Sequence, residues 1–187
     1  MPPPTFTGSP PPPGPIRLHI GGRVKKPGWV NMDILPNPGV ADVLGSCTDL
    51  SAFADGTVTE VYASHVFEHL DHVSELSRAI VEARRVLRAG GLLYVAVPDL
   101  EVLARLLLRP RLALADRWEL IRMFYGAQTD SADYHKVGFT FDILKQFLEQ
   151  DGFTNTRRVG SFGLFDDTSD FTFLGERISL NVITMKP

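Results

Sequence analysis

Residues 60–99, EVYASHVFEHLDHVSELSRAIVEARRVLRAGGLLYVAVPD, decide the fold. The segment 58–63, which overlaps their start, is short, β-branched and aromatic, as expected of a largely buried strand. From Val66 to Leu87, apolar residues recur every three or four positions and predict one long amphipathic helix. Gly90-Gly91 suits the end of that helix. The nearly all-apolar segment 92–97 then predicts a strand covered on both faces, which is typical of a parallel sheet.

This strand–helix–strand pattern predicts a right-handed βαβ unit. Ligands of open α/β sheets bind outside the carboxyl ends of the strands. Ser64 and His65 follow the first strand of the unit, and Asp99 follows the second. We therefore expect these side chains to lie along one edge of the sheet.

Working towards the N-terminus, the segment 16–20 predicts a first strand that is followed by Gly21 and Gly22. The segment 29–34 predicts a second strand that closes near Asp33, where a carboxylate can accept hydrogen bonds from both hydroxyls of a ribose. Only about ten residues separate the two strands, at the lower limit for a helical crossover. The first helix is therefore expected to be truncated or replaced by a loop.

Towards the C-terminus, the apolar periodicity predicts three helices and two strands. The helices are expected over 100–108, 112–125 and 141–150, and the strands over 154–161 and 178–185. The segment 126–140 is polar and aromatic, and a long loop of this kind is often a lid. We expect its Tyr134 and His135 to face a substrate.

Two motifs within the βαβ unit carry a resemblance to a known family. ASHVFEHL (63–70) followed by RRVLRAGGLLYVAVPDL (84–100) resembles the fourth-strand to fifth-strand segment of class I S-adenosylmethionine-dependent methyltransferases. The pattern is similar to methyltransferase type 11. FGLFDDTSDFTFLGERISLNVI (162–183) resembles the ending of members that modify bacterial polysaccharides and glycans.

The resemblance implies a fold, a cofactor and a set of site residues. The fold is a Rossmann-like α/β, three-layer αβα sandwich with a mainly parallel seven-stranded sheet and an antiparallel last strand. The cofactor is S-adenosyl-L-methionine, and the methyl acceptor is a small molecule or glycan methylated on oxygen or nitrogen. The expected cofactor-binding residues are Gly21, Gly22, Asp33, Asp49, Leu50, Ser64 and His65. The expected substrate-binding residues are Tyr134, His135 and Asp99, and the candidate catalytic bases are His65 and His135.

The composition sets the class of protein. The chain has 187 residues, 44% hydrophobic and 22% charged, which predicts one soluble domain. Residues 1–15 hold eight of the fourteen prolines and predict a disordered tail before a methyltransferase-like domain over 16–187. A net charge of −3 argues against nucleic acid as a partner. The single cysteine, together with the lack of a membrane span or signal peptide, favours a cytoplasmic protein.

Two other readings of the residues stay open. HVFEH (65–69) matches H-x-x-E-H, the zinc signature of inverted zincin proteases, but His65 directly follows a strand, so we expect no metal. The glycine loop departs from the family pattern, because His19 stands near the usual acidic position and Arg23 and Val24 interrupt the glycines. This departure motivates the alternative of a non-catalytic binding module.

Overall fold

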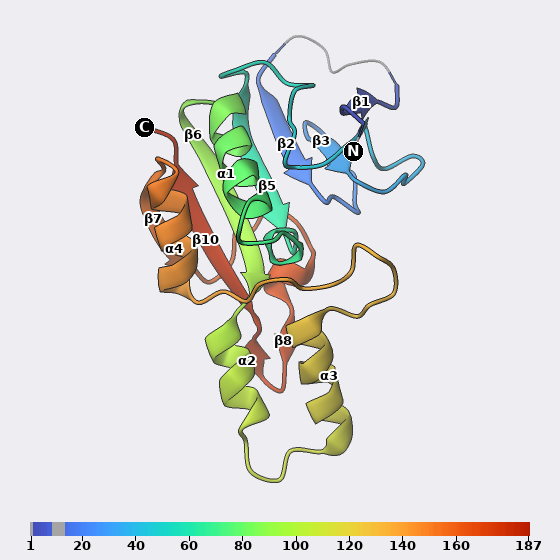
Figure 1. Cartoon of the computed structure of the whole chain (residues 1–187), viewed down its shortest axis with the longest axis vertical. Coiled ribbons are helices and arrows are strands. Elements are labelled where there is room, and N and C mark those ends of the chain that lie inside the picture. The colour runs from blue at the N-terminus through green and yellow to red at the C-terminus, as the bar shows by residue number, and fades with distance from the viewer. Residues whose placement is uncertain (1, 9–13) are drawn as a thin grey trace.

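The computed structural model describes residues 2–8 and 14–187, which are built around one eight-stranded sheet (Figure 1). The spatial order of its strands is β1-β4-β3-β2-β5-β6-β10-β7. These strands are β1 (Thr5–Phe6), β2 (Ile16–Ile20), β3 (Val30–Asp33), β4 (Val43–Leu44), β5 (Val58–Ser64), β6 (Leu87–Pro98), β7 (Thr154–Val159) and β10 (Ser179–Met185). The other elements are α1 (Glu75–Val86), α2 (Leu100–Leu107), α3 (Leu114–Tyr125), α4 (Phe141–Gln150), the 3-10 helices η1 (Phe67–His69) and η2 (Thr168–Asp170), and a hairpin of β8 (Thr172–Phe173) and β9 (Glu176–Arg177).

The strand directions confirm the predicted Rossmann-like α/β fold. β3 pairs in parallel with β2 and β4, and β5 pairs in parallel with β2 and β6. The final strand, β10, is antiparallel to both of its neighbours, β6 and β7. No helix stands between β2 and β3, as the short connection predicted. The sheet has eight strands instead of seven because β1 adds to its edge.

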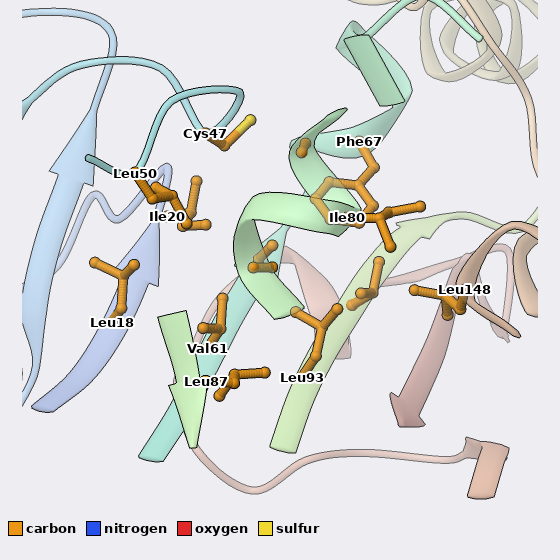
Figure 2. Close-up of a cluster of buried hydrophobic side chains, with 14 of the residues drawn as sticks. Leu18, Ile20, Cys47, Leu50, Val61, Phe67, Ile80, Leu87, Leu93 and Leu148 are labelled. Atoms are coloured by element: carbon orange, nitrogen blue, oxygen red, sulfur yellow. The ribbon is translucent and has the colours of Figure 1, made fainter. Parts of the chain in front are cut away.

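One face of the sheet carries α1 and α4 (Figure 1). Leu76 and Ile80 of α1 and Leu148 of α4 are fully buried in the main core. Figure 2 shows the side chain of Ile80 next to that of Phe67 of η1, and both belong to the same core cluster as Leu93 of β6. This burial explains why α1, with charged residues on its other side, keeps a fixed position over β5 and β6.

The opposite face of the sheet is covered differently. Tyr62 alternates with Val61 along β5, so it points away from α1. Its ring lies 5.5 Å from that of Phe162 and 4.7 Å from that of Phe165. Here an aromatic loop before η2 takes the place of the helical layer expected in a three-layer sandwich.

The long helix predicted from Val66 to Leu87 is interrupted in the structure. Only η1 and α1 are helical, and Leu70 between them is extended. The carboxylate Oδ1 of Asp71 accepts hydrogen bonds from the backbone N–H groups of Val73 and Ser74, at 3.0 and 2.7 Å. Such a local turn competes with the helix, and hydrophobic periodicity alone does not reveal it.

The predicted tail is ordered in part. Residues 1 and 9–13 lie outside the described residues, but Thr5–Phe6 form β1, antiparallel to β4. The ring of Phe6 lies edge-on to that of Phe53, 6.0 Å away, beside the main core. This apolar contact gives the segment the burial that its prolines cannot supply.

α2 and α3 form a smaller layer beyond the carboxyl end of β6 (Figure 1), around Leu103, Leu106 and Leu120. Asp99 begins α2, and its Oδ1 accepts from the backbone N–H groups of Glu101 and Val102, both at 3.1 Å. In the described ranges, 2–8 and 14–187, no helix combines the length and apolar character needed to cross a bilayer.

Asp99 is only 1% exposed, and its Oδ2 accepts from the guanidinium of Arg158. We expect Asp99→Ala to lower the free energy of unfolding by about 1–3 kcal/mol, because the helix loses its cap and Arg158 loses its partner. Asp99→Asn keeps a capping oxygen and should lose less. Urea unfolding followed by circular dichroism measures both, and an alanine variant as stable as the wild type would contradict the capping role.

Candidate active site

A cavity of about 780 Å³ opens at the carboxyl ends of three neighbouring strands. Ile20, Asp33 and Ser64 end β2, β3 and β5, and all three line the cavity. Its other walls come from η1, from the loop between α3 and α4, and from residues 165–168. Parallel strands end at the same edge, so polar residues distant in sequence meet here.

Most of the side chains expected to form the site do line this cavity. They are Gly21, Asp33, Ser64, His65, Tyr134 and His135. The other expected residues are not among the cavity-lining residues, namely Gly22, Asp49, Leu50 and Asp99.

Gly21 allows the backbone to approach whatever binds at the end of β2. Its φ is +70°, in the left-handed region that glycine tolerates. A Cβ atom there would lie 2.7 Å from Cγ2 of Val66, so any larger residue collides with the wall of the cavity.

Asp33 and Ser64 supply polar groups to the same part of the cavity. Oδ1 of Asp33 accepts from the backbone N–H of Leu35 at 2.9 Å, which holds the half-buried carboxylate at the cavity edge. Oγ of Ser64 is buried without a hydrogen-bond partner among the described residues. An unpaired buried hydroxyl is unfavourable, so this atom suits a bound ligand.

Asp49 and Leu50, which were expected to bind the cofactor, lie outside the cavity because the chain turns before them. The backbone N–H of Asp49 donates to the carbonyl of Ser46 at 3.0 Å, and this turn leaves Ser46 and Cys47 lining the cavity. Asp49 lies in a separate surface depression with Arg78, where hydrogen bonds from Ser51 lower its pKa. Leu50 is fully buried in the core.

Gly22 and Asp99 are excluded by packing. A Cβ atom at Gly22 would lie 2.9 Å from the side chains of His19 and Asn31, so this glycine fits between them. Both carboxylate oxygens of Asp99 are engaged, by the α2 cap and by Arg158. The carboxylate of Asp99 is therefore already used within the fold.

His65 has a hydrogen bond at one ring nitrogen and a close carboxylate at the other. Its Nε2 lies 2.9 Å from Oγ of Ser179, which itself donates to the carbonyl of Thr168, so Nε2 donates to Ser179. Its Nδ1 lies 3.0 Å from Oε1 of Glu68. The φ of His65 is +54°, so these contacts hold a strained backbone. This geometry suits a residue that positions its neighbours better than a free base.

His135 has one nitrogen available. Its Nδ1 lies 3.0 Å from the carbonyl of Met123, and since a carbonyl only accepts, Nδ1 carries the proton and Nε2 the lone pair. Burial lowers the pKa of His135, although the charge of Glu68 opposes this. Because burial favours the neutral ring, Nε2 keeps its lone pair and can accept a proton or a hydrogen bond.

The loop that carries His135 is fixed to η1. The backbone N–H groups of Lys136 and Val137 both donate to the carbonyl of Glu68, at 2.7 and 3.3 Å. Tyr134 lines the cavity and is 48% exposed. The predicted lid segment thus forms a wall of the cavity in this structure.

Residues near the C-terminus also line the cavity, which the sequence did not predict. Phe165 lines the cavity and packs on His19, with ring centroids 4.2 Å apart. Burial lowers the pKa of His19 to about 4, and the nearby charge of Asp167 only partly offsets this. The aromatic and acidic run after β7 was the available signal, but it does not indicate which strand end it would reach.

The arrangement of HVFEH does not match that of a zincin. The signature places both histidines on one α-helix, four residues apart. Here His65 precedes η1, and only residues 67–69 form a short 3-10 helix. His65 turns instead towards Glu68 and Ser179.

The residues present fit S-adenosyl-L-methionine at the end of the cavity near β2 and β3. Gly21 admits a close ligand, Asp33 offers a carboxylate for ribose hydroxyls, and Ser64 has an unpaired hydroxyl. His135 lies in the same cavity, at the wall made by the loop before α4.

Residues 29–95 match the family described as "Methyltransferase domain". No curated protein sequence matches the chain.

The solved structures similar to this chain include several methyltransferases. An S-adenosylmethionine-dependent methyltransferase from Archaeoglobus fulgidus is 16% identical, with a TM-score of 0.59 over 92% of this chain and 86% of the other. One from Thermotoga maritima, described as a possible histamine N-methyltransferase, is 16% identical, with a TM-score of 0.56 over 94% and 83%. Phosphoethanolamine N-methyltransferase 2 from Haemonchus contortus, in complex with S-adenosyl-L-methionine, is 10% identical, with a TM-score of 0.54 over 93% and 49%.

The chain therefore has the fold of these enzymes. The domain match covers residues 29–95, and the likeness in fold extends to S-adenosylmethionine-dependent methyltransferases.

The buried His19 makes stability depend on pH. Its folded pKa of about 4 lies below the ordinary 6.5, so the unfolded chain binds more protons between these values. The free energy of unfolding is not reduced by His19 above pH 6.5. It falls by up to about 3 kcal/mol as the pH drops towards 4, because the unfolded chain takes up the proton first. Urea unfolding at pH 7 and pH 5 should show a smaller acid destabilisation for His19→Phe than for the wild type. His72→Phe, at an exposed site, is the control, and equal acid sensitivity of the two variants would contradict the assignment.

Proposed function

We propose that this protein transfers a methyl group from S-adenosyl-L-methionine to a hydroxyl or amine of a small molecule or glycan. The observation that carries the proposal is a single cavity lined both by the Gly21, Asp33 and Ser64 cluster and by the His135 ring. Methyl transfer needs the methyl donor and the acceptor in line at short distance. A cavity with a donor-binding wall and an acceptor-binding wall can align them.

The residues near β2 and β3 act on the methyl donor. The carboxylate of Asp33 accepts hydrogen bonds from the ribose, and Ser64 donates or accepts one more. When bound, S-adenosyl-L-methionine supplies a methyl group already activated by a positively charged sulfur. The protein therefore mainly aligns the two reactants and excludes water.

The residues of the opposite wall act on the methyl acceptor. The lone pair of His135 Nε2 is the group that can interact with the acceptor's reacting hydroxyl or amine. Tyr134 beside it offers a partly exposed ring and hydroxyl that can pack on a sugar or other small acceptor. His65 is held by its hydrogen bond to Ser179 and lies beside Glu68.

A non-catalytic binding module is the second candidate. It is favoured by His19, which stands near the position where the resembled family has an acidic residue for the amino group of the methyl donor. Isothermal titration calorimetry with S-adenosyl-L-methionine and S-adenosyl-L-homocysteine tests both candidates. Binding of both compounds supports the methyltransferase, whereas no binding of either supports the module.

Removing the carboxylate at the end of β3 should weaken binding of the methyl donor. We expect Asp33→Ala to lower affinity for S-adenosyl-L-homocysteine by at least tenfold, because each hydrogen bond to a charged group contributes about 1.5–3 kcal/mol. Asp49→Ala is the matched control, since Asp49 lies outside the cavity. Calorimetry that finds the Asp33 variant unchanged would place the ribose elsewhere.

Removing the imidazole at the opposite wall should affect turnover and leave the methyl donor bound. We expect His135→Ala to lower the rate at which S-adenosyl-L-homocysteine is formed by about a hundredfold or more. The assays would offer sugars and small hydroxyl or amine compounds as methyl acceptors. Affinity for S-adenosyl-L-homocysteine should stay within about twofold. His72→Ala should behave as the wild type, and an unchanged rate for the His135 variant would remove this residue from the mechanism.

A further inference from the structure

Three side chains in the wall of the cavity form a compact set of potential metal ligands. They are Glu68 and His69 of η1 and His135 of the loop before α4. One carboxylate oxygen of Glu68 and one ring nitrogen of each histidine lie within 4.8 Å of one another. The rings of His69 and His135 stand edge to face, with centroids 4.9 Å apart.

The backbone orients both imidazoles in the same way. Nδ1 of His69 lies 3.1 Å from the carbonyl of Tyr134, and Nδ1 of His135 lies 3.0 Å from the carbonyl of Met123. Carbonyl oxygens only accept, so each Nδ1 carries the proton and each Nε2 keeps a lone pair. Metal-ligating histidines commonly donate their other N–H to a backbone carbonyl in this way.

Glu68 brings a buried negative charge without enough hydrogen-bond donors. Its side chain is 1% exposed, and Oε2 has no hydrogen-bond partner among the described residues. Oε1 approaches Nδ1 of His65 at 3.0 Å, although the two atoms are not aligned for a hydrogen bond. A buried carboxylate without hydrogen-bond donors is unfavourable, and a cation shared with the two nearby imidazoles would compensate its charge.

A metal ion requires a deprotonated carboxylate and neutral imidazoles as its ligands. The hydrogen bonds to the carbonyls of Tyr134 and Met123 leave one unprotonated nitrogen on each neutral ring.

We infer that Glu68, His69 and His135 bind one divalent first-row transition-metal ion, of which zinc is the best fit. Two imidazoles and one carboxylate suit this class, whereas magnesium and calcium prefer all-oxygen sites. Ligands of a tetrahedral zinc ion at about 2.0–2.1 Å lie roughly 3.4 Å apart, so small side-chain rotations complete the set. Three protein ligands leave an open position towards the cavity.

This set differs from the zincin signature weighed in the sequence. It replaces His65 with His135, which is far away in the chain. The sequence predicted no metal from the HVFEH segment alone. The structure adds His135, which lies outside that segment.

The inference rests on the proposed function and narrows its substrate class to hydroxyl acceptors. At the open position, a metal-bound hydroxyl has a lowered pKa and loses its proton to solvent. The acceptor oxygen then forms a bond to the methyl carbon, the carbon–sulfur bond breaks, and its electron pair stays on sulfur. The products are a methyl ether, neutral S-adenosyl-L-homocysteine and one proton. His135 then acts as a metal ligand and not as a direct base.

The test is calorimetric titration of zinc chloride into the full chain after chelator treatment. We expect one zinc per chain, with affinity at least a hundredfold weaker in His69→Ala and His135→Ala. His72→Ala removes an exposed imidazole three residues from His69 and should bind zinc as the wild type does. No binding by the wild type, or equal binding by all variants, would overturn the inference.

Two further measurements keep the test decisive. Circular dichroism shows whether each variant is folded. If a variant is not, cobalt(II) is titrated into the wild type, which should then give the visible absorption of a tetrahedral site. Absence of this absorption would count against the proposal. S-adenosyl-L-homocysteine should bind the metal-free wild type. Zinc binding without S-adenosyl-L-homocysteine binding supports the metal site and overturns the methyltransferase. The reverse result overturns only the metal site.

Discussion

The architecture depends on the parallel pairing of β5 with β2 on one side and β6 on the other. This pairing fixes three strand ends at one edge and places Ser64, His65 and η1 directly beyond them. β5 itself is buried through Val61, Tyr62 and Ala63, so it cannot slip without exposing one face of the core. The cavity is therefore a consequence of strand register, and its polar lining sits on a rigid support.

The two faces of the sheet are covered by different means. On the α1 and α4 side, aliphatic side chains interdigitate as in an ordinary core. On the other side, Phe162 and Phe165 pack on Tyr62, Tyr94 and His19. Because the crossover between β2 and β3 is too short for a helix, this segment supplies the missing cover. It also brings residues 165–168 to the cavity wall, so the same contact that closes the fold helps to shape the site.

Several of the buried polar groups that lack a hydrogen-bond partner among the described residues line this cavity. Ser64 and Glu68 line it and lack full hydrogen bonding, and His19 is kept neutral by burial at its edge. Each of these costs folding free energy that an apolar residue would not. Such groups are expected where ligands bind, because the ligand completes the hydrogen bonds that the protein leaves open.

Local chemistry in the sequence was enough to determine the βαβ unit, most helix and strand positions and the gathering of Gly21, Asp33, Ser64 and His65 at one edge. Hydrophobic periodicity and strand-end position encode these features within a few residues. Tertiary structure alone decided the rest. The turn at Ser46 leaves Asp49 and Leu50 outside the cavity, and Arg158 from a distant strand binds the carboxylate of Asp99. Backbone hydrogen bonds from Lys136 and Val137 to Glu68 bring His135 to η1. These outcomes depend on contacts between residues far apart in the chain, and no local pattern records which distant partner a side chain will meet.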